Sequence, residues 1–171
     1  MTYIDRIYPI QRPVLHVGFS GTRFGMKDPQ KVTLGKIMTD IIAWSHFIGS
    51  EVHIHHGDCV GADDEFHHIC RALDVDRIII HPPNVDSHRA LCEADESRDP
   101  YPHLQRNARI VQEAKVMITA PPTEIEQARG GTWSTTRIAR DAGKLWRCVL
   151  PSGIAIPGPS AWDNIAQAAG L

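Results

Sequence analysis

Short apolar runs rich in β-branched residues alternate along the chain with longer segments whose apolar positions recur every three to four residues. The short runs lie at residues 14–18, 51–55, 77–81, 115–119 and 145–150, and the amphipathic segments at 29–47, 62–73, 102–114 and 132–142. This alternation is typical of βαβ units, in which a helix connects neighbouring parallel strands. The pattern therefore predicts an α/β fold, a three-layer sandwich with a mainly parallel sheet of at least five strands.

Cap and turn residues mark several boundaries of these elements. Asp28 followed by Pro29 predicts a helix N-cap with proline at the first helical position, and Gly143 predicts a C′ residue after the last of these helices. The polar residues 84–100 predict a long excursion over one edge of the sheet. A short terminal helix is expected to begin at Ser160.

Length and charge limit the function classes that the chain can serve. With 171 residues we expect one domain, residues 1–171, with its core at about 14–150. The 18 Lys and Arg residues against 20 Asp and Glu give a net charge of −2. Nucleic acid is therefore an unlikely partner, because binding to its backbone needs clustered positive charge.

Cysteine spacing and hydropathy give further expectations about the cellular compartment and about membrane association. The four cysteines contain no CxxC pair, and neither a zinc ribbon nor a compact disulfide framework fits their spacing. No apolar run approaches the roughly 18 residues of a membrane helix, and no signal peptide is evident at the start. We expect a cytoplasmic protein without a membrane partner.

Histidines crowd the segment 53–70 together with two cysteines. Strand periodicity places His53 and His55 on one face and His56 on the other, and the neighbours His67 and His68 diverge on a helix. A tetrahedral metal site needs three or four such ligands to converge. We therefore interpret these histidines as structural, and we expect neither a metal ion nor a cofactor.

Three glycine-bearing turns, at residues 18–23, 57–63 and 130–135, each follow a predicted strand and precede a helix. In a parallel sheet such turns share the carboxyl edge, where ligands bind. Glycine permits close approach of the backbone, and the free N–H groups of a helix N-terminus favour phosphate. Each turn alone could use glycine only for tight geometry, but three at one edge favour a phosphate-binding pocket. None is a GxGxxG or Walker A loop, so a standard NAD(P) dehydrogenase or P-loop NTPase is not expected.

Three residues in these turns have alternative interpretations. The carboxylates of Asp58 and Asp63 could bind ribose hydroxyls, whereas Asp63 could equally be only a helix N-cap. Trp133 could stack on a base or serve in packing. The sequence leaves these alternatives open.

Four motifs together resemble the SLOG superfamily in order and spacing: SGTR at 20–23, GDxxGAD at 57–63, Arg-Asn at 106–107 and GGT at 130–132. The most similar group is the YspA/YpsA-type YAcAr branch, with Lonely Guy phosphoribohydrolases and DprA as distant relatives. The resemblance implies a Rossmann-like fold, a pocket for a nucleotide-derived small molecule with phosphate at the GGT turn, and a homodimer. It also implies that Arg106 pairs with phosphate and that Asn107 holds a neighbouring loop. The alternative for this pair is an ordinary solvent-facing position on a helix.

The motifs and the resemblance together give one set of expected ligand-binding residues. These are Ser20, Gly21, Thr22, Arg23, Gly57, Asp58, Gly61, Ala62, Asp63, Arg106, Asn107, Gly130, Gly131, Thr132, Trp133 and Thr135.

One departure from the Lonely Guy pattern bears on catalysis. That pattern, PGGxGTxxE, ends in a glutamate that serves glycosidic cleavage, and Thr135 occupies the corresponding position here. A hydroxyl can neither stabilise an oxocarbenium ion nor activate water as a carboxylate does. We therefore expect a sensor or sequestering module for a nucleotide, ADP-ribose-like or nucleoside monophosphate-like, with no assigned catalytic residue. The alternative is an N-glycosidic hydrolase that uses another acid at this edge: Asp58, Asp63, Asp64, Glu124 or Glu126.

Overall fold

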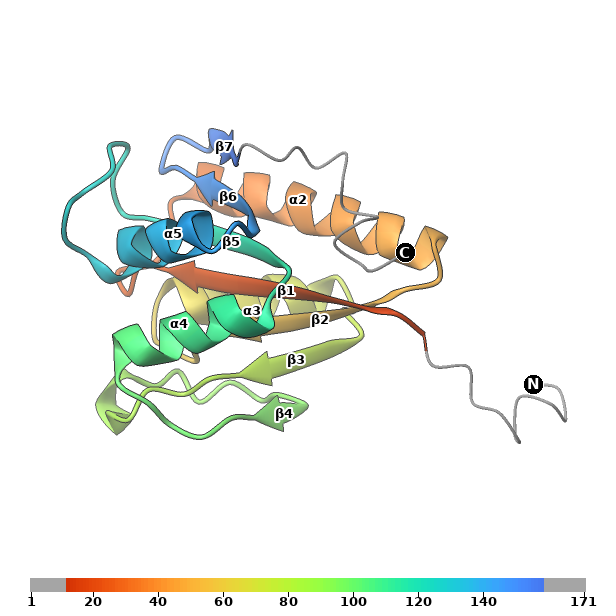
Figure 1. Ribbon diagram of the computed structural model, residues 1–171, viewed down its shortest axis with the longest axis horizontal. Helices are drawn as coiled ribbons and strands as arrows, with labels where there is room; N and C mark the ends of the chain where they lie inside the picture. The colour runs from red at the N-terminus through yellow and green to blue at the C-terminus, as the bar shows by residue number, and fades with distance from the viewer. Residues whose placement is uncertain (1–11, 159–171) are drawn as a thin grey trace, which may run out of the picture.

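A seven-stranded sheet forms the middle layer of the computed structural model, which describes residues 12–158 (Figure 1). The strands are β1 (Val14–Gly21), β2 (Glu51–His56), β3 (Arg77–Ile80), β4 (Glu96–Ser97), β5 (Val116–Ala120), β6 (Leu145–Val149) and β7 (Ala155–Pro157). Their order is β4-β3-β2-β1-β5-β6-β7, and only β7 runs antiparallel to its neighbour. The predicted α/β fold with a mainly parallel sheet is confirmed.

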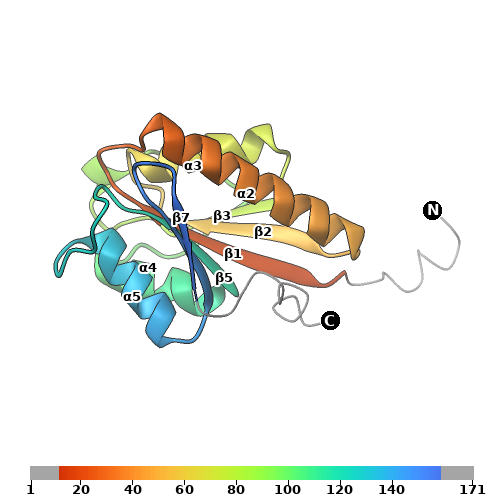
Figure 2. The ribbon, with the colours of Figure 1, turned by 90° about the horizontal axis from the view of Figure 1, so that it is seen from above.

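In the described part of the chain, four α-helices cover the two faces of this sheet (Figure 2). Helices α2 (Asp28–Phe47) and α3 (Ala62–Ala72) lie on one face, and α4 (His103–Glu113) and α5 (Gly131–Asp141) lie on the other. The central strand β1 is buried between them, and Phe19 stacks on Phe66 of α3 with ring centroids 4.1 Å apart. Because the central strands of the sheet are buried on both faces, their sequences are continuous apolar runs. Within residues 12–158, no helix has the length and hydropathy needed to cross a membrane.

The structure corrects one helix boundary and confirms another. Helix α2 begins at Asp28 with Lys27 as its N-cap, because the Gln30 side chain accepts the Lys27 N–H at 2.9 Å. Gly143 follows α5 with φ of +66°, as expected for a C′ glycine. The helix expected from Ser160 lies outside the described residues.

Both edges of the sheet differ from the sequence-based expectation. The excursion at 84–100 contains a 3₁₀ helix, η1 (Asp86–His88), and the strand β4, which pairs with β3. Asp95 supports this pairing, because its carboxylate accepts the N–H of Ile78 at 2.8 Å. Strand β7 lies in a Pro- and Gly-rich segment without the period-two pattern that marks longer strands, so the sequence did not indicate it.

The three glycine turns meet at the carboxyl edge of the sheet, as predicted. Gly21 ends β1 beside Ala120 of β5, and these two neighbouring strands form a topological switch point, where ligands bind in open α/β sheets. A Cβ on Gly21 would lie 2.3 Å from the Cβ of Ala62. A Cβ on Gly61 would lie 2.4 Å from the carbonyl oxygen of Arg23, so glycine permits close contact between the first two turns.

Candidate functional site

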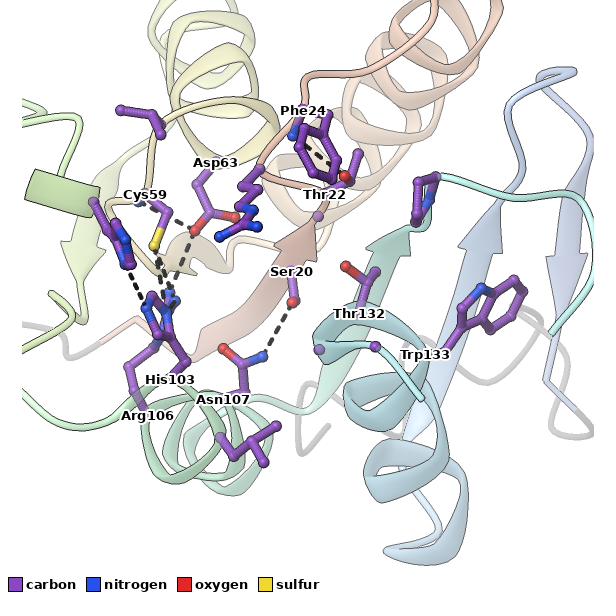
Figure 3. Close-up of a pocket in the computed structure, with 18 of the residues that line it drawn as sticks. Ser20, Thr22, Phe24, Cys59, Asp63, His103, Arg106, Asn107, Thr132 and Trp133 are labelled. Atoms are coloured by element: carbon purple, nitrogen blue, oxygen red, sulfur yellow. Dashed lines mark hydrogen bonds and ion pairs between the residues drawn. The ribbon is translucent and has the colours of Figure 1, made fainter. Parts of the chain in front are cut away.

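A cavity of about 510 Å³ opens at this edge, between the ends of β1 and β5 and the first turns of α4 and α5 (Figure 3). The predicted residues that line it are Ser20, Gly21, Thr22, Arg23, Asp63, Arg106, Asn107, Gly130, Gly131, Thr132 and Trp133. The predicted residues Gly57, Asp58, Gly61, Ala62 and Thr135 are not part of its lining. The cavity therefore gathers residues from all four motifs.

Arg106 and Asp63 form a buried ion pair in the wall of the cavity. Arg106 Nη1 lies 3.3 Å from Asp63 Oδ2, and the same oxygen accepts the backbone N–H of Cys59. The solvent-facing alternative for Arg106 is therefore wrong. The N-cap alternative for Asp63 is also wrong, because Gly61, with φ of +93°, caps α3.

The charges around the cavity favour an anion. Arg23 and Arg129 lie at its exposed rim and Arg106 lies inside, whereas Asp63 is the only carboxylate among the described lining residues. Burial raises the pKa of Asp63, and the Arg106 guanidinium opposes that shift. The pairing of Asp63 with Arg106 leaves the two rim arginines as the excess charge.

Gly57 contributes to the cavity indirectly. A Cβ at this position would lie 0.9 Å from Arg106 Nη1 and 2.5 Å from Asp63 Oδ2. The glycine therefore makes room for the ion pair, rather than offering its backbone to a ligand as the sequence suggested.

Asp58 anchors a neighbouring loop instead of lining the cavity. It is buried with φ of +53°, and its carboxylate accepts the Nε–H of Arg89 and the backbone N–H of Cys92, both at 2.8 Å. Each carboxylate oxygen thus already has a partner. The expectation that Asp58 binds a ribose hydroxyl is not supported by this geometry.

Asn107 connects three elements behind the cavity wall. Its Nδ2 donates to Thr135 Oγ1 at 2.7 Å and lies 3.5 Å from Ser20 Oγ, and Thr135 donates to the carbonyl of Gly131. This arrangement matches the expected role of Asn107 in holding a neighbouring segment. Thr135 is fully buried behind the first turn of α5.

Three buried polar atoms of the lining residues have no hydrogen-bond partner within the described part of the chain: Asp63 Oδ1, Arg106 Nε and Asn107 Oδ1. Leaving a buried donor or acceptor unpaired costs about 1–3 kcal/mol. A bound polar ligand is one way to remove that cost.

The first turn of α5 faces the cavity with Gly130, Gly131 and Thr132. The first backbone N–H groups of a helix lack intrahelical acceptors, and the helix dipole adds positive potential there. Gly130 has φ of +122°, a conformation that other residues rarely adopt. This turn is therefore suited to a phosphate group.

Trp133 serves in packing. Its side chain is buried against Cys148 and Leu150, and its Nε1 donates to Thr123 Oγ1 at 2.9 Å. Figure 3 shows the indole turned away from Arg106 and Asp63. The structure thus supports the packing interpretation over base stacking.

Sequence reasoning missed several lining residues. Phe24 and Leu104 line the cavity with exposed fractions of 80% and 58%, and Cys59, His88 and His103 form part of its wall. The signals available were modest: His103 precedes Arg106 by one helical turn, and Cys59 lies within the second glycine turn. Exposure of two large apolar side chains at one cavity points to an apolar ligand surface.

Cys59 and the two histidines are in contact with one another. His103 Nδ1 lies 3.9 Å from Cys59 Sγ, and His103 Nε2 lies 3.0 Å from His88 Nδ1. Burial lowers the pKa of His103, as does the nearby Arg106. Burial raises the pKa of the Cys59 thiol, and Arg106 opposes that shift.

The other acids considered for catalysis lie elsewhere. Glu124 accepts hydrogen bonds from Ser152, and Glu126 pairs with Arg137 and Arg140. Asp64 is not among the lining residues either. Asp63 is therefore the one candidate acid that the described cavity contains.

Histidines converge more than the sequence analysis suggested, in two groups away from the cavity. His56, His67 and Cys92 form one group, and His55, His81 and Glu113 form the other. In the first, the N–H of Asp58 already donates to His56 Nδ1. In the second, Arg98 already pairs with Glu113. These competing contacts favour the structural interpretation of the histidines.

Comparison with known proteins adds information about the fold. No protein-family model and no curated protein sequence matches the chain. Among solved structures, the molybdenum cofactor binding protein from the phototrophic bacterium Rippkaea orientalis is 16% identical with a TM-score of 0.56, and the match covers 82% of this chain and 78% of that one. The molybdenum cofactor carrier protein MCP from Chlamydomonas reinhardtii is 16% identical with a TM-score of 0.52, over 82% and 76% of the two chains. TM1055 is 14% identical with a TM-score of 0.52, over 77% and 72%.

At these identities the likeness concerns the fold. This chain therefore shares its α/β fold with these three solved structures.

Proposed function

We propose that the cavity binds a nucleotide or nucleotide-derived ligand, ADP-ribose-like or nucleoside monophosphate-like, and that the protein acts as a sensor or sequestering module. The observation that carries the proposal is the juxtaposition of a helix N-terminus, two rim arginines and unpaired buried polar atoms in one cavity. These features suit a ligand that is both anionic and rich in hydrogen-bonding groups.

The two ends of such a ligand have separate binding groups in the cavity. The first turn of α5 is placed for phosphate, with Arg23 and Arg129 adding charge at the rim. Phe24 and Leu104 offer exposed apolar surface on which a planar base can pack. Asn107 Oδ1 and Arg106 Nε are available to the ribose or to the phosphates.

Binding without hydrolysis is favoured by the position of the acids. Thr135 supplies no carboxylate, and its hydroxyl is already bonded to Gly131 and Asn107. Asp63 is the remaining acid, and its Oδ2 is paired with Arg106 instead of being directed at a sugar or a water molecule. The alternative, an N-glycosidic hydrolase, would have to rely on Asp63.

Two structural neighbours are named as binding or carrier proteins for the molybdenum cofactor, which supports a carrier or sequestering role for a fold of this kind. That cofactor therefore belongs among the compounds tested. The assignment to the YspA-type branch and the homodimer are further proposals that rest on the motif resemblance alone.

The test measures binding and turnover on the same samples. Calorimetry with AMP, ADP-ribose and the molybdenum cofactor should give saturable binding to one of them, with no released base from the two nucleotides. Arg106→Ala should weaken binding of that ligand by about 1.5–3 kcal/mol, the scale of a hydrogen bond to a charged group. Arg77→Ala, which removes an exposed arginine on β3, is the matched control.

Two outcomes would contradict this proposal. Unchanged affinity in Arg106→Ala would remove Arg106 from the site. Release of base at roughly 1 s⁻¹ or faster, lost in Asp63→Asn, would replace the binding module with the hydrolase.

A further inference from the structure

One wall of the cavity carries a thiol and two imidazoles that the proposed function does not use. Cys59 lies in the loop before α3, His103 is the first residue of α4, and His88 is the last residue of η1. Figure 3 shows Cys59 and His103 facing each other beside Arg106. Three segments that are distant in sequence thus bring a nucleophile and two bases to one cavity.

The contacts of His103 fix the position of its proton. Arg106 Nη2 lies 3.3 Å from His103 Nδ1, and a guanidinium can only donate, so Nδ1 carries a lone pair. In the neutral ring the proton is then on Nε2, which donates to His88 Nδ1 at 3.0 Å. His103 Nδ1 also lies 3.9 Å from Cys59 Sγ, and Arg106 Nη2 contacts both atoms, so the lone pair becomes available to the thiol proton when Nη2 donates to the sulfur instead.

We propose that Cys59 is a nucleophile that adds to an electrophilic carbon of an anionic ligand in this cavity, with His103 as its general base. The proposal rests on the proposed function for the location of the ligand and deepens it by naming a ligand class. That class is the phosphorylated aldehydes, which include the open-chain form of the terminal ribose of ADP-ribose and the open-chain forms of simpler sugar phosphates. The arginines and the α5 N-terminus bind the phosphate, and the thiol reaches the carbonyl.

The addition balances without any further reactant. The Cys59 sulfur forms a bond to the carbonyl carbon, and the π electron pair of the C=O bond moves to the oxygen. The thiol proton passes to His103 Nδ1 and from there to that oxygen. The product is a hemithioacetal, and the reverse steps release the aldehyde and restore the thiol.

The charged groups around the Cys59 sulfur are consistent with Cys59 as the nucleophile and His103 as its base. Arg106 Nη2 lies 3.1 Å from Cys59 Sγ and stabilises negative charge on it, whereas Asp63 and Asp58 oppose that charge. The thiol is therefore protonated at rest and needs a base during attack. His103 is neutral at pH 7 because burial and Arg106 lower its pKa, so it is able to serve as that base.

The cysteines provide an internal control for this reactivity. Cys92 is more exposed than Cys59, and its Sγ lies 3.8 Å from Asp64 Oδ1. His56 and His67 have ring nitrogens within 4.8 Å of that sulfur, but within the described residues neither forms a hydrogen bond with it. Exposure favours Cys92 for alkylation, whereas burial and the Asp58 carboxylate raise the pKa of its thiol. The effect of a substitution at His103 therefore separates base assistance at Cys59 from these differences between the two thiols.

Alkylation with iodoacetamide, followed for each cysteine by peptide mass spectrometry, tests the pair. At pH 7 we expect Cys59 to react at least about tenfold faster than Cys92, a modest part of what general base catalysis contributes. His103→Gln should slow Cys59 by at least about tenfold and leave Cys92 unchanged. His46→Gln, which changes an exposed histidine on α2, should change neither rate.

The pH profile of wild-type alkylation needs no variant. With His103 as the base, the Cys59 rate should show a step below pH 6.5, the ordinary pKa of histidine, in addition to the rise that thiol ionisation causes above pH 9.0. A profile that shows only the rise from thiol ionisation, with no step below pH 6.5, would overturn the proposal. Cys59 no faster than Cys92, or a normal rate in His103→Gln, would overturn it as well.

A matched pair of ligands tests the addition itself. Glyceraldehyde 3-phosphate and glycerol 3-phosphate share the phosphate, but only the first has a carbonyl. We expect the aldehyde to raise the melting temperature at a concentration about tenfold lower, equivalent to about 1.4 kcal/mol, and Cys59→Ser to abolish that difference. Equal shifts by both compounds in the wild type would overturn covalent addition, while nucleotide binding by calorimetry would still test the proposed function separately.

Discussion

The smallest change with a large expected effect is a methyl group at Gly57. In Gly57→Ala the new Cβ would occupy the position of Arg106 Nη1, so the guanidinium must leave its pair with Asp63. Overpacking of this kind costs about 1–3 kcal/mol, and we expect nucleotide affinity to fall with it. Urea unfolding and calorimetry measure the two effects.

Gly35→Ala is the control for this prediction. Gly35 lies within α2, and a Cβ there has no neighbour within 4 Å, so alanine should stabilise the protein by about 0.5–1 kcal/mol. If Gly57→Ala leaves the ligand affinity unaltered, ligand binding does not depend on the present position of the Arg106 guanidinium.

At the scale of an element, Asp58 holds the segment that carries His88 and Cys92. Asp58→Asn keeps a residue that tolerates a φ of +53°, so the substitution isolates the carboxylate and its bonds to Arg89 and Cys92. We expect a loss of about 1.5–3 kcal/mol, measured by urea unfolding, and faster proteolysis within 86–92.

Asp74→Asn is the matched control, because Asp74 has the same φ of +53° but is exposed. Equal effects of the two substitutions would show that the Asp58 carboxylate does not anchor the segment.

The same elements show what the sequence could and could not predict. Helix and strand periodicity is local, so the sequence predicted the βαβ order and the meeting of the three glycine turns. The role of Gly57 depends on Arg106, a residue far along the chain, and the role of Asp58 depends on a loop without periodicity. Strand β4 has only two residues, too few to show a period of two. Contacts between distant segments therefore account for most of the corrections.

For the whole molecule, buried histidines make stability depend on pH. Burial lowers the pKa of His55 to about 2 and that of His81 to about 4, and it lowers the pKa of His56 well below the ordinary 6.5. The unfolded chain therefore takes up protons before the folded chain does. Stability is fully present above pH 6.5 and falls as the pH decreases from 6.5 towards 4, where His81 protonates in the folded state.

Urea unfolding at pH 7.5 and 5.5 measures this loss. One pH unit below 6.5, each of the three histidines should cost up to about 1.4 kcal/mol, so we expect a decrease of roughly 3–4 kcal/mol. His81→Gln should reduce the slope by about one proton. If the free energy of unfolding is the same at both pH values, the three imidazoles are protonated as readily in the folded protein as in the unfolded chain.

The two outer strands of the sheet bear on how copies of this protein can associate. An open sheet edge is a template for strand addition from another chain, which leads to aggregation. Here β4 offers only two residues at one edge, and β7 at the other edge ends in Pro157, which has no N–H to donate. Both described edges therefore discourage growth of the sheet from one molecule into the next. A homodimer, if this chain forms one, is then expected to use its helical layers and to stay closed rather than extend into fibres.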